Sequence, residues 1–229
     1  MNESIRKLKE AADNNKLVVF VGAGVSANSG LPDWKELIEE YRDALEMDKS
    51  KPISSDEYLK IPQYYYNMRG FKDYYDIINK VFNKNYNPNK IHELIFRLAP
   101  QHIITTNYDN LIEQEKEKQG LLYDVVCEDK DLPYTPNGKL IIKMHGDLKR
   151  KNIVLKEEDY LSYEENFRLI ETFIKSLFVN HTVVFIGYSL GDYDLKLIIN
   201  NVKSILGKHF QKGYIINSSD QGKRIFILE

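Results

Sequence analysis

Cysteine is almost missing from the 229-residue sequence, which contains Cys127 alone. A single cysteine excludes an internal disulfide framework and any zinc site made of four cysteines. A strong charge of either sign is missing too, because 32 Lys and Arg stand against 34 Asp and Glu, for a net charge of −2. Proteins whose main function is to bind nucleic acid usually have a basic surface that contacts the phosphate backbone. The near-equal numbers of basic and acidic residues therefore argue against nucleic-acid binding as the main function.

Long apolar runs are absent as well. No stretch approaches the roughly 18 consecutive apolar residues of a membrane-spanning helix. The N-terminal residues 1–16 are polar, unlike a signal peptide. We therefore expect a soluble protein of the cytoplasm with no membrane partner. Its 42% apolar and 12% aromatic residues suffice for a sizeable core.

Five short β-branched runs predict the strands. Most of them are apolar at every position, which is typical of strands buried on both faces of a parallel sheet. Helical patterns stand between them, and this alternation predicts a doubly wound α/β fold with a mostly parallel, Rossmann-like sheet. The expected strands are 17–21, 102–106, 140–144, 182–186 and 214–217, with 123–127 and 224–228 as further candidates. The expected helices are 4–14, 34–45, 89–98, 110–119 and 194–206.

One interval, at about 48–87, interrupts this alternation. It has no strand-like run and is dense in tyrosine, at 64–66 and 74–75. We expect a helical insert beside the sheet, within a single domain that spans residues 1–229. The tyrosines either pack inside the insert or form a lid over a ligand, and the sequence leaves both roles open.

The first motif that carries chemistry follows the expected strand 17–21. Residues 22–27, GAGVSA, fit the pattern G-x-G-x-x-A, in which glycines let the backbone turn tightly and approach a pyrophosphate. Free N–H groups and the dipole of a following helix would favour the anion. A standard dinucleotide fold also needs an acid at the end of a second strand about 20 residues later. Residues 35–45 have a helical pattern instead, so the motif does not indicate a standard dehydrogenase.

Three further motifs follow three other expected strands. They are TTNYD at 105–109, KMHGD at 143–147 and FIGYSLGD at 185–192. Because ligands bind at the carboxyl ends of parallel strands, we expect these motifs at one edge of the sheet. Asn107 offers an amide, Asp109 a carboxylate, and His145 a group for acid–base work near neutral pH. Ordinary roles stay open, because Asn or Asp often caps the next helix and a lone histidine is more often structural.

Together the motifs resemble those of the sirtuin family. GAGVSANSGLPDW at 22–34 is similar to the sirtuin signature GAGxSxxSGIPDF, and TTNYD is similar to TQNID. HGD at 145–147 matches the catalytic HG, and GYSLGD at 187–192 resembles GTSL. The ordered set runs from about residue 17 to residue 217, so the resemblance implies a sirtuin-like NAD-binding domain over nearly the whole chain.

Departures from the sirtuin pattern narrow the expectation. Sirtuin deacylases carry a zinc module with two CxxC pairs, which a chain with one cysteine lacks, so we expect no zinc. Lys35 replaces the arginine that often follows PDF. The variants TNYD and GYSLGD look more like the sirtuin-like domains of bacterial anti-phage defence proteins, members of which hydrolyse NAD. The resemblance therefore implies an NAD glycohydrolase with NAD as its substrate.

The same resemblance implies partners. Defence proteins of this kind often form oligomers and stay silent until triggered, so we expect a homo-oligomer. Their relatives often carry a sensor domain or have a separate partner, and 229 residues leave no room for a second large domain. Either the trigger is a separate sensor or activator chain, or the sequence is a fragment of a longer protein.

By this resemblance each candidate residue has an expected role in NAD hydrolysis. Asn107 would orient the ribose and the attacking water, His145 would be the general base, and Asp109 would fix the ribose or a neighbouring side chain. The residues expected to bind NAD are Gly22, Ala23, Gly24 and Ser26 at the pyrophosphate, Asp33 and Trp34 at the nicotinamide, Thr106 beside Asn107, and Gly187, Ser189 and Asn217 at the adenosine half. We expect no metal, since NAD supplies its own leaving group.

Two other functions remain open. A zinc-free sirtuin relative would remove acyl groups from proteins, and an acyl-lysine peptide would then accelerate nicotinamide release. A non-enzymatic module that senses NAD or ADP-ribose would bind its ligand without turnover. The presence of both Asn107 and His145 counts against a module that only binds.

Overall fold

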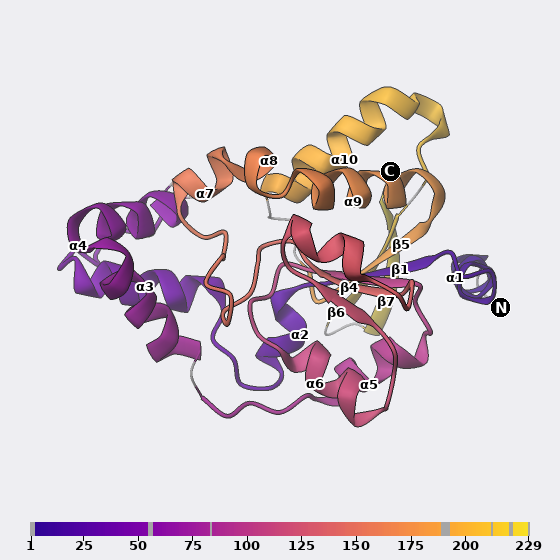
Figure 1. Ribbon diagram of the computed structural model, residues 1–229, viewed down its shortest axis with the longest axis horizontal. Coiled ribbons are helices and arrows are strands. Elements are labelled where there is room, and N and C mark those ends of the chain that lie inside the picture. The colour runs from indigo at the N-terminus through magenta and orange to yellow at the C-terminus, as the bar shows by residue number, and fades with distance from the viewer. Residues whose placement is uncertain are drawn as a thin grey trace.

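A seven-stranded sheet forms the centre of the protein, in the order β3-β4-β2-β1-β5-β6-β7 (Figure 1). The computed structural model describes residues 3–54, 57–82, 84–188, 193–211, 213–219 and 222–228. The strands are β1 (Leu17–Val21), β2 (His102–Thr105), β3 (Asp124–Val126), β4 (Leu140–Lys143), β5 (Thr182–Ile186), β6 (Gly213–Ser219) and β7 (Gly222–Leu228). Every neighbouring pair is parallel except β6 and β7. The prediction of a mostly parallel sheet is confirmed, and both further candidate strands are present.

Helices connect the strands. They are α1 (Glu3–Asp13), α2 (Ala23–Ala27), α3 (Trp34–Ala44), α4 (Glu57–Phe82), α5 (Lys90–Arg97), α6 (Leu111–Lys118), α7 (Glu157–Leu161), α8 (Tyr163–Asn166), α9 (Arg168–Asn180) and α10 (Tyr193–Leu206), with 3₁₀ turns η1 (Asp129–Tyr134) and η2 (Gly207–His209). The five expected helices are present within one or two residues at each end. Helices α2, α7, α8 and α9 were not predicted, although the buried residues of α9 at 170, 174, 177 and 178 have helical spacing.

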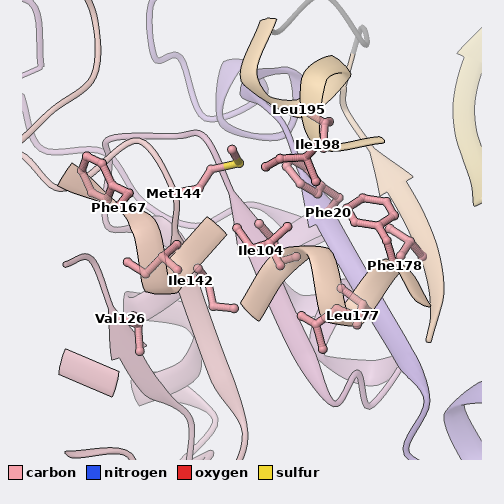
Figure 2. Close-up of a cluster of buried hydrophobic side chains, with 14 of the residues drawn as sticks. Phe20, Ile104, Val126, Ile142, Met144, Phe167, Leu177, Phe178, Leu195 and Ile198 are labelled. Carbon is pink, nitrogen blue, oxygen red and sulfur yellow. The ribbon is translucent and has the colours of Figure 1, made fainter. Parts of the chain in front are cut away.

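Helices cover both faces of the sheet, because consecutive strand residues point to opposite sides. On one face Phe20 and Ile104 pack against α9 and α10, through residues such as Leu177 and Ile198 (Figure 2). On the other face the alternate strand residues pack against α1, α5 and α6; they include Leu17, Val19, Val21, Ile103, Ile141 and Val184. Each fully buried aliphatic side chain contributes roughly 1.5–3 kcal/mol relative to exposure. The two apolar layers explain why the strands lack polar alternation, and they confirm the doubly wound fold.

Helices α3 and α4 pack on each other to one side of the sheet, around a cluster rich in tyrosine (Figure 1). The Tyr41 and Tyr74 rings stack at 5.4 Å, and the Tyr41 hydroxyl donates to the backbone oxygen of Tyr74 at 2.9 Å. Tyr65 and Tyr75 are buried in the same cluster. Gly70 interrupts α4 with a φ of +79°, so the helix consists of two stretches joined at a kink. These three tyrosines of α4 therefore have the packing role. That residues 1–229 form a single domain with an insert at 48–87 stays a prediction.

Within the described part of the chain, no helix combines the length and the apolar character needed to cross a bilayer.

Candidate functional site

The four central strands end at one level of the sheet. Val21 of β1 pairs with Thr105 of β2 and with Ile186 of β5, and Thr105 pairs with Lys143 of β4. Parallel strands at equal register end at the same edge, because all of them run in one direction. The next residues along the chain lie within the four motifs; they are Gly22, Thr106, Met144 and Gly187. We call the segments 22–34, 105–109, 143–147 and 187–188 the strand-end site.

Asn107 and His145 lie on neighbouring strands at this edge. Asn107 lies two residues after Thr105, and His145 lies two residues after Lys143, which pairs with Thr105 in the sheet. The Met144 N–H donates to the Thr105 oxygen at 3.0 Å. Both side chains are buried, at 7% exposure for Asn107 and 3% for His145. The amide and the imidazole are thus on the same edge of the sheet, as expected from the motifs.

The glycine turn packs directly against the turn after β5. The N–H of Gly22 donates to the Ile186 oxygen at 3.0 Å, and the N–H of Gly24 donates to the Gly187 oxygen at 2.9 Å. A Cβ on Gly22 would lie 2.4 Å from the Gly187 oxygen, so no side chain fits between the turns. The expectation of free N–H groups at this turn is wrong for Gly22 and Gly24, because the β5 turn occupies them.

Asn107 joins the second motif to the first. Its backbone N–H donates to the Thr105 hydroxyl at 3.0 Å, and its side-chain Nδ2 donates to Ser26 Oγ at 3.0 Å and to the Gly22 oxygen at 3.3 Å. The remaining amide atom, Oδ1, is buried and has no hydrogen-bond partner within the described residues. Buried polar atoms are nearly always paired, so Oδ1 is an acceptor suited to a hydroxyl or water brought by a ligand.

His145 lies between two tyrosines that the sequence patterns did not identify. Its ring meets Tyr160 of α7 edge-on at 5.6 Å and Tyr163 of α8 at 6.2 Å. The Trp34 ring stacks on the Tyr160 ring, with 6.4 Å between the ring centroids and an interplanar angle of 9°. Trp34 from the first motif is therefore linked to His145 through one aromatic ring. A helical pattern at 157–166 would have predicted the helices that carry Tyr160 and Tyr163, but not their contact with His145.

Two carboxylates among the expected site residues accept backbone N–H groups where a helix begins. Asp33 is exposed and forms a capping box with Glu36 at the start of α3, with distances of 2.8 Å in both directions. Asp109 Oδ1 accepts the N–H of Leu111 at 3.0 Å as α6 begins. Asp33 therefore caps α3, a role that the sequence did not predict for it, and Asp109 lies one residue before the N-cap of α6.

Lys143, the last residue of β4, is fully buried within the strand-end site. Its ammonium contacts Glu113 Oε1 at 3.0 Å and Asp147 Oδ2 at 2.5 Å. Burial lowers the pKa of Lys143, but the two carboxylates outweigh it and leave that pKa raised. Burial raises the pKa of Asp147, which Lys143 more than offsets, so the pKa of Asp147 is lowered. At Glu113 burial dominates and the pKa stays raised. The buried lysine is therefore charged, and Asp147 is its charged partner.

The remaining expected residues lie farther from these contacts or outside what is described. Thr106 is half-buried and directly precedes Asn107. Ser189 lies outside the described residues. Asn217 pairs with Arg224 in the ladder between β6 and β7, and nothing is described of its side chain. The structure thus brings Gly22, Gly24, Ser26, Asn107 and Gly187 into direct contact, with His145 on the adjacent strand end.

The sequence matches known protein families and relatives. The model for the SIR2-like domain matches residues 101–226, and the model for the Sir2 family matches residues 22–128. Defense-associated sirtuin 2 of Bacillus subtilis is 39% identical over 221 residues, which are 94% of this chain and 22% of that protein. NAD(+) hydrolase ThsA of Cytobacillus dafuensis is 30% identical over 213 residues, which are 92% of this chain and 42% of that protein.

A solved structure shares the fold. The crystal structure of a Sir2 homolog–NAD complex superposes with a TM-score of 0.53 at 18% identity, covering 92% of this chain and 80% of that one. The chain spans about a fifth of the length of the first curated relative and less than half of the second.

Proposed function

The chain belongs to the SIR2-like domain family, and from that premise we propose that its strand-end site hydrolyses NAD to nicotinamide and ADP-ribose. The observation that carries the proposal is the Asn107 amide, which is buried against Ser26 of the glycine loop with Oδ1 left for a ligand. The names of two relatives support it, since one is an NAD(+) hydrolase and the other a defence-associated sirtuin.

The reaction needs few chemical groups from the protein. The bond between the nicotinamide nitrogen and ribose C1′ breaks with its electron pair on nicotinamide, and positive charge develops at C1′. A water oxygen then bonds to C1′ and loses one proton. The balance is NAD⁺ plus water giving nicotinamide, ADP-ribose and one proton. The site must hold the ribose, limit water and accept that proton.

We assign the roles as follows. Asn107 Oδ1 accepts a hydrogen bond from a ribose hydroxyl or from the attacking water. His145 takes the proton, and its flanking tyrosines limit access of bulk water. Ser26 carries most of the pyrophosphate contact, because the N–H groups of Gly22 and Gly24 are occupied.

The other residues complete the proposed site. Asp109 steadies the Asn107 segment through the hydrogen bond that its carboxylate accepts from the Leu111 N–H. The remaining proposed NAD contacts are Ala23 beside the pyrophosphate, Asp33 and Trp34 at the nicotinamide, Thr106 at the ribose, and Gly187, Ser189 and Asn217 at the adenosine half.

Product analysis tests the proposal. The purified chain is incubated with NAD, and the products are separated by chromatography. We expect nicotinamide and ADP-ribose in equal amounts, at a rate that an acetyl-lysine peptide does not change. Formation of O-acetyl-ADP-ribose with the peptide would support a deacylase instead. Saturable binding of NAD without any nicotinamide would support a sensing module and contradict hydrolysis.

We also propose that the activity belongs to bacterial anti-phage defence in the cytoplasm. The name of the Bacillus subtilis relative, a defence-associated sirtuin, supports this. A homo-oligomer and a separate sensor or activator form part of the proposal. Light scattering after size-exclusion chromatography tests the oligomer, and a monomer at every concentration, with and without NAD, would contradict it.

A further inference from the structure

A buried ionic cluster is centred on Lys143, at the end of β4. Lys143 has a fully buried side chain, and its ammonium donates to four oxygens. These are Glu113 Oε1 at 3.0 Å, Asp147 Oδ2 at 2.5 Å, the backbone oxygen of Tyr108 at 3.2 Å and that of Asp109 at 2.7 Å. We call Lys143, Glu113 and Asp147 the lysine cluster. The proposed hydrolysis uses none of the three directly.

The lysine cluster holds both halves of the proposed catalytic pair. On one side Lys143 fixes the backbone at Tyr108 and Asp109, immediately after Asn107. On the other side it holds Asp147, two residues after His145. One ammonium therefore connects the segment that carries the amide with the segment that carries the imidazole.

Both segments are tied down at their other ends. The Thr105 hydroxyl accepts the N–H of Asn107 and donates to the Val21 oxygen at 2.9 Å. The His145 oxygen accepts the N–H of Val154 at 3.0 Å. With these ends fixed, the two segments are joined by the lysine cluster and by the Tyr108 hydroxyl, which donates to the Val154 oxygen at 2.6 Å.

Stability alone does not explain a charge at this place. At the same register level β1, β2 and β5 carry Val21, Thr105 and Ile186, and only β4 of these four strands carries an ionisable group. Replacing a buried ion pair by apolar side chains of similar size is often neutral or stabilising. We therefore expect the buried charge at this position to fix the geometry of the segments that carry Asn107 and His145.

We propose that Lys143 is a positioning residue, which sets the relation between the Asn107 amide and the His145 ring. The claim rests on the proposed NAD hydrolysis for its kinetic consequence, but not for its structural one. Loss of the ammonium should lower kcat and leave KM nearly unchanged, because the segments still bind NAD but no longer align the water and the base.

The main variant removes all three ionisable side chains of the lysine cluster. Lys143→Met, Glu113→Gln and Asp147→Asn are combined, so that no buried charge is left without a partner. In the unmodified chain Asp147 Oδ1 accepts the N–H of Lys149 at 2.8 Å. Asp147→Asn keeps an oxygen that can accept this hydrogen bond. We expect a melting temperature near that of the unmodified chain and a kcat lower by about 100-fold. A folded triple variant with full kcat would overturn the proposal.

A second pair of variants guards against misfolding of the triple variant. Glu113→Gln weakens the hold on Lys143, whereas Glu115→Gln changes a buried carboxylate of the same helix that pairs with Lys118 and Gln119. We expect kcat to fall by about tenfold for Glu113→Gln and to stay unchanged for Glu115→Gln. Equal effects of the two substitutions would overturn the positioning role.

A spectroscopic measurement separates this proposal from the proposed function. The five histidines are labelled with ¹³C at Cε1, and the His145 signal is identified by its loss in His145→Gln. We expect that signal to move in the triple variant and in Glu113→Gln, but not in Glu115→Gln. A signal that moves in a chain unable to cleave NAD would uphold the positioning role and refute hydrolysis. A signal that stays in place in the triple variant would refute the positioning role whatever the activity.

Discussion

Replacement of Asn107 by alanine is expected to lower the rate of nicotinamide release from NAD by about 10²–10³-fold, the usual cost of removing one aligned polar group from a transition-state site. The substitution removes Oδ1, the buried acceptor with no partner within the described residues. It also removes the two donations that join Asn107 to Ser26 and Gly22. Both changes act on the ribose and the attacking water, so kcat should fall more than KM rises. Initial rates measured by chromatography over a range of NAD concentrations give both quantities.

A matched control is Asn137→Ala. Asn137 also makes two hydrogen bonds, from its N–H and Nδ2 to the Asp124 carboxylate, but Asp124 begins β3 and lies at the opposite edge of the sheet. We expect this variant to keep the rate of the unmodified chain. If Asn107→Ala is folded and releases nicotinamide as fast as Asn137→Ala, the assignment of the catalytic amide is wrong.

Gly187→Ala is expected to have the second large effect, on the fold of the site as well as on activity. Its added Cβ would lie 2.6 Å from the Val25 nitrogen and 3.0 Å from the carbonyl carbon of Gly24, in a backbone conformation with a φ of +63°. Backbone strain and the clash together should cost about 2–4 kcal/mol of unfolding free energy. The turn after β5 must then move away from the glycine loop, and NAD hydrolysis should fall by about 100-fold.

Gly120→Ala is the control for the backbone strain. Gly120 has nearly the same φ, +65°, but nothing lies within 4 Å of its Cβ position. Its substitution should cost only about 1 kcal/mol and leave the rate unchanged. Urea unfolding of both variants measures the difference. Similar losses for Gly187→Ala and Gly120→Ala would mean that the contact between the two turns contributes nothing to the site.

The strands and their shared edge could be predicted from the sequence because the signals are local. An apolar run such as 182–186 predicts a buried parallel strand, and parallel strands place their carboxyl ends together. The cap formed by Asp33 and Glu36 also follows a local pattern, an acid followed three residues later by Glu, but Asp33 was predicted to contact the nicotinamide and not to cap α3.

What could not be predicted depends on chain segments that are far apart in sequence. The N–H groups of Gly22 and Gly24 are occupied by the turn after β5, which a motif at 22–27 does not reveal. Tyr160 reaches His145 only because α7 returns over the carboxyl end of β4. Lys143 looked like one polar residue in an apolar strand, and its partners are set by the path of the chain between Tyr108 and Glu113.

If the four strand-end segments form one NAD site, NAD should protect all of them from hydrogen–deuterium exchange. The His145→Gln chain, which should bind NAD without rapid cleavage, is compared with and without saturating NAD. With NAD bound, we expect backbone amides to exchange more slowly in all four segments, 22–26, 105–109, 143–147 and 187–188. We expect little change on the outer faces of α9 and α10. Slower exchange confined to the groove between α9 and α10, lined by residues such as Val179 and Ile205, or no change at saturating NAD, would contradict the single NAD site.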